Sequence, residues 1–338
     1  MKQSDSDRGN TGIDTALAVD IMLEKFEIIQ EMLYKHNYDD FHSDKPSECM
    51  KAITQTMDFV IGLGEVEKKR FMQVVTELAK AFALCATEPE AHELNAEIGF
   101  SKVVKAGIVK LISVEGAKKT SSQIDAQLNQ LISKSVISDE VIDIYSSLGI
   151  ENPDISILSD EFLDEVRALP QKNLAVELLN HLLQGRVKNV QRTNLVKAQK
   201  FTDMLHNAIN KYNKRANETS KVIEELIQLA KEMNESYKAG EATGLIKEEV
   251  AFYDVLASHD TAEQVLGDDI LKVIAHELMK AIKENMSIDW NLRESARAKM
   301  RITVRRLLKK YGYPPDLQKL AVETVVKQAE LMAGGMEI

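Results

Sequence analysis

A positively charged stretch near the C-terminus holds the residues whose types and spacing could do chemistry. Between Arg293 and Lys310, eight residues are basic and one is acidic. Five of the basic residues recur at every fourth position, which places them on one slowly winding stripe of a helix: Arg293, Arg297, Arg301, Arg305 and Lys309. Such a stripe could bind phosphate groups or the acidic surface of a partner protein. These five residues are therefore the candidate nucleic-acid-binding or partner-binding residues.

The same stripe also has a purely structural interpretation. Its cations could form salt bridges with acids on neighbouring helices, such as Glu224, Glu225 and Glu232. The chain has 43 basic and 53 acidic residues, with a formal net charge of −10, so the molecule as a whole repels a phosphate backbone. Any contact with nucleic acid must then be local. Salt bridging, a partner protein and nucleic acid all remain open.

Motifs for catalysis and for metal binding are incomplete in this sequence. The segment GAKKT at 116–120 lacks the earlier glycine of a phosphate-binding loop. The segment AHEL, at 91–94 and again at 275–278, lacks the second histidine of a zinc-binding helix. The Pro-Asp dipeptides at 153–154 and 315–316 precede no strand with the acid and lysine of a metal-dependent nuclease, and are better interpreted as helix starts. We expect no catalytic residue, metal ligand or bound cofactor here.

Cysteine usage and hydropathy indicate the cellular compartment in which the protein is expected to act. Cys49 and Cys85 are the only cysteines, and neither lies in a CxxC motif or beside a histidine, which favours reduced structural thiols in a cytoplasmic protein. The first twelve residues, MKQSDSDRGNTG, have no apolar core, and nowhere do 18 apolar residues run together. The sequence therefore predicts neither a signal peptide nor a membrane span.

Composition and periodicity predict an all-α fold. Aromatic residues make up only 5% of the chain, and the spacing of apolar residues is helical almost throughout. The segment 100–112 is rich in β-branched residues and resembles a strand, but its apolar spacing favours a helix. All six prolines lie at proposed helix starts. The segments 137–145 and 158–166 each present a serine followed by two acids, which is a helix-capping pattern.

The longest helical pattern dominates the expected architecture. From Arg186 to Ala239, 54 residues contain no glycine or proline. This predicts one very long helix, about 190–238, or two stacked end to end, and an unbroken helix of the whole stretch would span roughly 80 Å. A kink is expected at the polar run Asn213–Glu218. The expected fold is an extended multi-helix bundle organised around this long helix.

Several stretches resemble one known family. They are DISILSDEFLDEVRALPQKNLAVELLNHLL at 154–183, KRANETSKVIEELIQLAKEM at 214–233, EEVAFYDVLA at 248–257 and IDWNLRESARAKMRITVRRLLKKYGYPPD at 288–316. These are similar to the C-terminal helical region of the R subunit, the motor and restriction subunit, of type I restriction-modification enzymes. Two earlier stretches, VDIMLEKFEII and KKRFMQVVTELAKAFAL, look like the helices that follow the second motor domain of that subunit.

Composition and the resemblance together predict a division of the chain into three parts. Residues 1–12 are expected to be a disordered or cut end, and residues 13–150 an N-terminal helical subdomain that follows the motor lobes. Residues 151–338 are expected to be a C-terminal helical subdomain with the long helix and the basic helix. In the family, a nuclease domain and two helicase lobes precede this region and use ATP and Mg²⁺ to translocate and cleave DNA. Because their motifs are absent from these residues, no catalytic residue can be carried over.

Three functions follow as hypotheses. The first, implied by the resemblance, is a non-catalytic region that docks the R subunit onto the methyltransferase core of M and S subunits and braces its own motor and nuclease domains. The second is a nucleic-acid-binding helical domain that contacts DNA through the basic helix, 292–310. The third is a helical scaffold unrelated to restriction. All three are expected to act in the cytoplasm, away from membranes.

Overall fold

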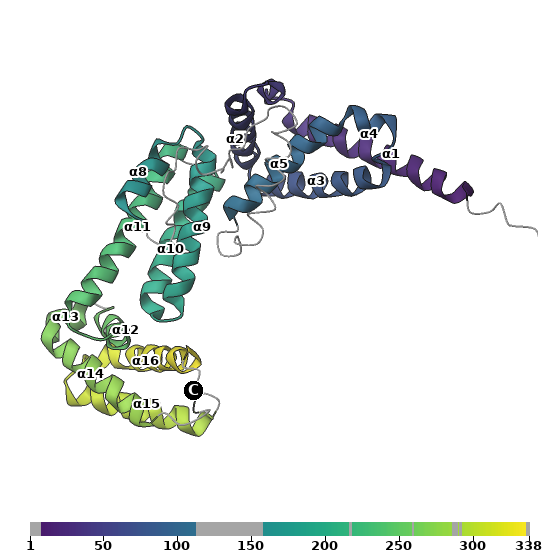
Figure 1. Ribbon diagram of the computed structural model, residues 1–338. Helices are drawn as coiled ribbons and strands as arrows, with labels where there is room; N and C mark the ends of the chain where they lie inside the picture. Colours follow the sequence, from purple (N-terminus) through teal and green to yellow (C-terminus); the bar gives the residue numbers. More distant parts are fainter. Residues whose placement is uncertain are drawn as a thin grey trace, which may run out of the picture. The chain divides into compact units, whose positions relative to one another are not determined.

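The structure is a computed structural model that describes residues 8–112, 158–215, 218–258, 260–285, 290 and 293–335. These residues form fourteen α-helices and one short 3₁₀ helix, with no strand among them (Figure 1). The predicted all-α fold class is confirmed. The chain divides into two compact units, Met1–Leu182 with Asn210–Glu225 (unit one) and Leu183–Ile209 with Leu226–Ile338 (unit two). The predicted subdomain boundary at 150/151 lies outside the described residues.

Unit one is built largely from the N-terminal helices. Its elements are α1 (Arg8–Leu33), η1 (Asp39–His42), α2 (Pro46–Gly62), α3 (Glu65–Cys85), α4 (Pro89–Glu93), α5 (Asn95–Ile112), α8 (Asp160–Ala168) and the first part of α9 (Lys172–Gln191). Within it, α1 and α3 pack against each other. Lys25 Nζ lies 3.3 Å from Glu77 Oε2, and Cys85 Sγ lies 3.6 Å from Met22 Sδ, which is an antiparallel register.

Both cysteines lie in the apolar interior of unit one. Cys49 on α2 and Cys85 on α3 are buried and free, in agreement with their interpretation as structural thiols. Burial raises the pKa of both thiols, because a thiolate loses its hydration there. The reactive thiolate form is therefore disfavoured at neutral pH.

Unit two contains the C-terminal helices. They are α10 (Leu195–Asn213) and α11 (Thr219–Ala242), each of which also contributes residues to unit one, followed by α12 (Lys247–Ala257), α13 (Asp260–Leu266), α14 (Asp268–Asn285), α15 (Glu294–Lys310) and α16 (Pro315–Gly335). The apolar faces of α12 to α16 form one core, which includes Phe252 and Val325 from these helices and Trp290 from the segment before α15. Tyr313 is 1% exposed there and donates a hydrogen bond from Oη to Leu256 O (3.0 Å). Burial raises the pKa of Tyr313 to about 12.

The one very long helix predicted for 190–238 is not confirmed. The structure divides this segment into the end of α9, then α10, then α11. The first break lies between Gln191 and Leu195, where the Asn194 N–H donates to Val190 O (2.8 Å). Asn194 Oδ1 then accepts the Lys197 N–H (3.0 Å) and caps the start of α10. The missed signal was an asparagine cap, because the prediction looked for breaks only at glycine, at proline and at the polar run 213–218.

The second break falls within the polar run where a kink was expected. Helix α10 ends at Asn213 and α11 begins at Thr219, and Arg215 has a φ of 50°, in the left-handed region. Lys211 Nζ lies 2.9 Å from Glu225 Oε2 in unit one, and Lys200 Nζ lies 4.0 Å from Glu232 Oε2 in unit two. Both pairs have an antiparallel register. The predicted kink is therefore a full turn between two paired helices.

Several local predictions are confirmed. The β-branched segment 100–112 lies in helix α5. Ser159 caps α8, because its Oγ accepts the Phe162 N–H (3.3 Å); the similar segment 137–145 lies outside the described residues. Pro46, Pro89 and Pro315 are the first residues of their helices. In the described part of the chain, no helix is long and apolar enough to cross a membrane.

Candidate functional site

Helix α15 carries the predicted basic stripe. Met300, Val304 and Leu308 are at most 1% exposed and anchor this helix in the core of unit two. Every fourth residue of a helix is displaced by about 40° around its axis, so the stripe winds from the edge of the core toward solvent. Its middle members, Arg297 and Arg301, are half-buried, whereas Arg305 and Lys309 are exposed.

The middle of the stripe is committed to salt bridges. Arg297 Nε lies 2.9 Å from Glu330 Oε1 on α16, and Arg301 Nη1 lies 2.9 Å from Glu294 Oε1 on its own helix. The Arg297 contact is an ion pair without hydrogen-bond geometry, because both of its atoms are buried without a hydrogen-bond partner. Both arginines are half-buried; the Arg297 pair joins α15 to α16, whereas the Arg301 pair lies within α15.

The acids expected to neutralise the stripe have other partners. Glu224 pairs with Arg167, Glu225 with Lys211 and Glu232 with Lys200. The structural interpretation of the stripe therefore applies to Arg297 and Arg301, through Glu330 and Glu294 instead of the acids named from the sequence. Arg293, the residue before α15, is exposed and forms no ion pair with a described residue.

The solvent-exposed side of α15 carries a different set of cations from the predicted stripe. We call it the cationic face, and it consists of Lys299, Arg305, Arg306, Lys309 and Lys310. All five are exposed, none forms an ion pair with a described residue, and no acid of α15 lies among them. Only Arg305 and Lys309 belonged to the predicted stripe. The other three could have been found from the buried positions 300, 304 and 308, because they lie on the opposite side of the helix.

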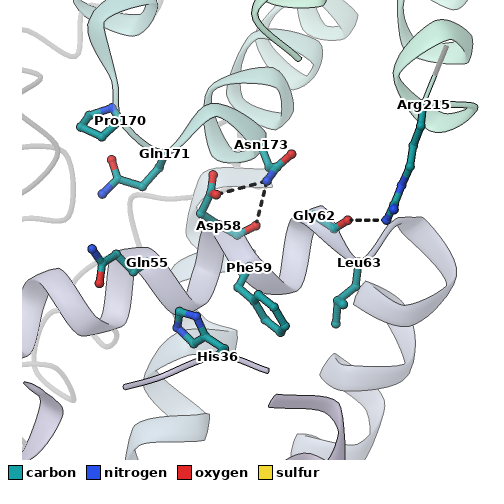
Figure 2. A pocket seen from close by; sticks show the side chains of 10 residues that line it. All are labelled: His36, Gln55, Asp58, Phe59, Gly62, Leu63, Pro170, Gln171, Asn173 and Arg215. Atoms are coloured by element: carbon teal, nitrogen blue, oxygen red, sulfur yellow. Dashed lines mark hydrogen bonds between the residues drawn. The ribbon is translucent and has the colours of Figure 1, made fainter. Parts of the chain in front are cut away.

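A cleft in unit one is the second candidate site. Its volume is about 520 Å³, and it lies between α2 and the start of α9, beside the loop before η1 (Figure 2). The lining residues are His36, Gln55, Asp58, Phe59, Gly62, Leu63, Pro170, Gln171, Asn173 and Arg215. Figure 2 shows Asp58 and Asn173 pointing toward each other and Arg215 reaching Gly62.

The polar groups of the cleft are largely bonded to one another. Asp58 accepts hydrogen bonds from Asn173 Nδ2 (3.1 Å) and from the Leu174 N–H (3.0 Å). The second bond satisfies an otherwise unpaired N–H in the first turn of α9, so a carboxylate on α2 caps a helix that is distant in sequence. Tyr212 Oη donates to Asn173 Oδ1 (3.0 Å), and Arg215 Nη2 donates to Gly62 O (3.3 Å). The Asp58 bonds fasten α2 to α9, and the other two connect the C-terminal end of α10 to both helices.

His36 is likewise held in the structure. Its Nε2 lies 2.9 Å from Thr56 Oγ1, and its ring stacks on Phe59 with centroids 4.8 Å apart. Burial lowers the pKa of His36 and outweighs the opposing effect of Asp58. The imidazole is therefore neutral at pH 7, and its hydrogen bond to Thr56 persists there.

The close approach at Gly62 gives a testable prediction. A Cβ at this position would lie 2.7 Å from Asn173 Nδ2, so Gly62→Ala must displace Asn173 and weaken its bond to Asp58. We expect a loss of about 1–3 kcal/mol in unfolding free energy, measured by urea denaturation. Gly185→Ala is the matched control, because nothing lies within 4 Å of its Cβ; inside α9 it should stabilise by about 0.5–1 kcal/mol. A loss at both positions would contradict the steric explanation.

The described residues contain no group of three or more His, Cys, Asp or Glu side chains that could hold a metal ion. In the second AHEL segment, His276 Nδ1 lies 2.6 Å from Glu249 Oε1 on α12. The segment GAKKT lies outside the described residues. Pro315 is the first residue of α16, which agrees with the interpretation of the dipeptide at 315–316 as a helix start.

The fold and sites thus define an all-α protein with two features: a cationic helix face, and a cleft whose polar groups are largely hydrogen-bonded to one another. Comparison with known proteins then gives the family. Residues 5–335 match the family described as "Type I restriction enzyme HindI endonuclease subunit-like, C-terminal". Because this match covers nearly the whole sequence, the chain belongs to that family, and the resemblance found in the sequence is confirmed.

Two curated relatives support this membership. The chain is 36% identical over 269 residues to the type I restriction enzyme HindI endonuclease subunit of Haemophilus influenzae, a match that covers 80% of this chain and 25% of the relative. It is 28% identical over 314 residues to the putative type I restriction enzyme MjaIXP endonuclease subunit of Methanocaldococcus jannaschii, covering 92% of this chain and 30% of the relative. The chain thus spans less than a third of the length of these relatives. No solved structure matches it.

Proposed function

We propose that this chain is the non-catalytic assembly region of a type I restriction endonuclease subunit. In this role it docks the subunit onto a methyltransferase core of M and S subunits and braces the motor. The observation that carries the proposal is the family match over residues 5–335, to a region described as C-terminal within such subunits. Cleavage of DNA, and the ATP and Mg²⁺ that it uses, are assigned to other domains of the whole subunit, and the site of action is the cytoplasm.

The helical architecture suits this role. Docking and bracing need surfaces held in fixed positions, and packed helices supply them without any reacting group. In unit one, bonds between residues distant in sequence, such as Asp58 to Leu174 and Lys68 to Glu177, hold helix α9 in place. In unit two, α14, α15 and α16 share one apolar core. Each unit therefore presents stable helix faces to a partner.

The test is a deletion within the whole subunit. The deletion should remove all residues that correspond to 8–335, because a cut at Arg186 would sever α9. The truncated subunit is expected to form no complex with the methyltransferase core in size-exclusion chromatography with light scattering. Because the motor also loses its brace, its DNA-stimulated ATP hydrolysis should fall while nucleotide binding persists.

The experiment tests docking and bracing separately. A stable complex with the truncated subunit would contradict docking through this region. Unchanged ATP hydrolysis would contradict bracing. Retained nucleotide binding is the control for folding of the remaining domains.

A further inference from the structure

We infer that the cationic face of α15 binds the phosphate backbone of duplex DNA without reading its sequence. The inference goes beyond docking and bracing and does not depend on either. It concerns Lys299, Arg305, Arg306, Lys309 and Lys310, together with the helix that presents them.

The first argument is the contrast between the two sides of the same helix. Arg297 and Arg301 lie near the core and are neutralised by Glu330 and Glu294. The five cations on the solvent side have no acid of α15 between them and no ion pair with a described residue. On a chain with a net charge of −10, this gathers five exposed positive charges on one side of a single helix, where they can attract an anionic partner locally.

The second argument is geometric. From Lys299 to Lys310 the helix rises about 16 Å. Duplex DNA carries one negative charge per about 1.7 Å of its axis, so a ridge of this length can contact several phosphates at once. Met300, Val304 and Leu308 hold the helix in the core of unit two, so the cations stand on a rigid support. Little backbone ordering is then needed on binding.

The third argument separates DNA from an acidic protein surface. Protein interfaces are enriched in aromatic anchors and depleted in lysine at their centre. The cationic face has three lysines, and the one aromatic ring recorded against it, Tyr311 beneath Lys310 Nζ at 5.0 Å, is half-buried against the core; its one large exposed apolar side chain is Ile302, at 49%. Lysine and arginine are the usual partners of phosphate oxygens. The face has no Asn or Gln for reading adenine, and its arginines and lysines can all contact phosphates, so the proposed contact is with the backbone.

The experiment measures DNA binding by the 338-residue chain. Fluorescence anisotropy with a fluorescein-labelled duplex of about 20 base pairs is followed at several salt concentrations between about 50 and 200 mM KCl. Each phosphate contact contributes about 0.9 to the slope of log K against log salt, so five contacts predict a slope of about −4 to −5. The variant Arg305→Gln/Arg306→Gln/Lys309→Gln/Lys310→Gln should reduce this slope to about −1 and weaken binding at least 10-fold at the lowest salt concentration.

Two control variants make the result specific to this face. Lys35→Gln/Lys51→Gln/Lys80→Gln/Lys102→Gln removes the same four charges from exposed positions of unit one that form no ion pair with a described residue. It should leave the slope unchanged. Ile302→Ser removes the apolar side chain of the face and should leave DNA binding unchanged. Circular dichroism and thermal melting check that every variant is folded.

Three outcomes would overturn the inference. The first is no binding by the wild-type chain at the lowest salt concentration. The second is an equal loss of binding and slope in the two fourfold variants. The third is normal DNA binding by the α15 variant together with lost capture by the methyltransferase core, which would identify the face as a protein-docking surface. DNA binding without any capture by the methyltransferase core would instead contradict the proposed docking and leave this inference standing.

Discussion

Replacing Lys68 with alanine should lower the free energy of unfolding by about 3–5 kcal/mol. The Lys68 side chain on α3 is 4% exposed, and its Nζ lies 2.8 Å from Glu177 Oε1 and 2.7 Å from Glu65 Oε2. Glu177 on α9 is itself only 16% exposed. Removing the ammonium leaves a mostly buried carboxylate without its counter-ion. This destabilises the fold more than replacing both charged groups together would. Urea denaturation followed by circular dichroism measures the loss.

The same contact predicts how stability depends on pH. Burial by itself would lower the pKa of Lys68, but Glu177 and Glu65 outweigh burial and raise it above the ordinary 10.5. The folded state therefore holds this proton more tightly than the unfolded state does. The resulting stabilisation is fully present below pH 10.5 and is lost as pH rises through the folded-state pKa. The difference in stability between wild type and Lys68→Met should shrink over that range.

Neighbouring substitutions test the explanation. Lys69 is 69% exposed and pairs with Glu65 across one helical turn, so Lys69→Ala should change stability by less than about 0.5 kcal/mol. The double variant Lys68→Met/Glu177→Leu should recover most of the loss, because it removes both charges together. Equal costs for Lys68→Ala and Lys69→Ala would contradict the role of the buried ion pair.

The second large effect is expected at Gln328 in α16. Its side chain is fully buried and bridges two backbone groups next to the turn between α9 and α10. Gln328 Oε1 accepts the Leu195 N–H (2.8 Å), and Nε2 donates to Thr193 O (2.8 Å). Leu195 begins α10, so its N–H has no partner within that helix. Gln328→Met keeps the volume but leaves both backbone groups unpaired, at a cost of about 2–4 kcal/mol.

A surface glutamine provides the comparison for this prediction. Gln199 on α10 is exposed and hydrogen-bonds to Asp203 on its own helix (2.9 Å). Gln199→Met should therefore change the free energy of unfolding by less than about 0.5 kcal/mol in the same urea titration. If Gln328→Met cost no more than Gln199→Met, the bridge to the α9–α10 turn would not contribute to stability.

Local features of the fold were predictable from sequence because their causes are local. Pro46 begins α2 through its fixed φ, and Ser159 caps α8 through a side chain three residues from the N–H that it accepts. The helical spacing of 100–112 outweighed its β-branched composition, and α5 results. The turn before α10 was missed because an asparagine cap is a weaker signal than glycine or proline.

The contacts between helices, and the sorting of the cations on α15, could not be predicted from the sequence pattern. Lys68 and Glu177 are 109 residues apart, and Gln328 and Thr193 are 135 apart, so their bonds follow only from which helices are neighbours. For α15, the every-fourth-residue spacing grouped Arg297 and Arg301 with Arg305. Only the buried side of the helix, and Glu330 on the neighbouring helix, separate the structural cations from the exposed ones.

The central claim is that this region assembles the endonuclease subunit with its methyltransferase. Capture of the purified 338-residue chain by its cognate core of M and S subunits tests it most directly, with and without duplex DNA, at about 50 and 200 mM salt. The account predicts stable capture without DNA that persists at the higher salt concentration. Capture only in the presence of DNA, or no capture at all, would contradict docking through this region.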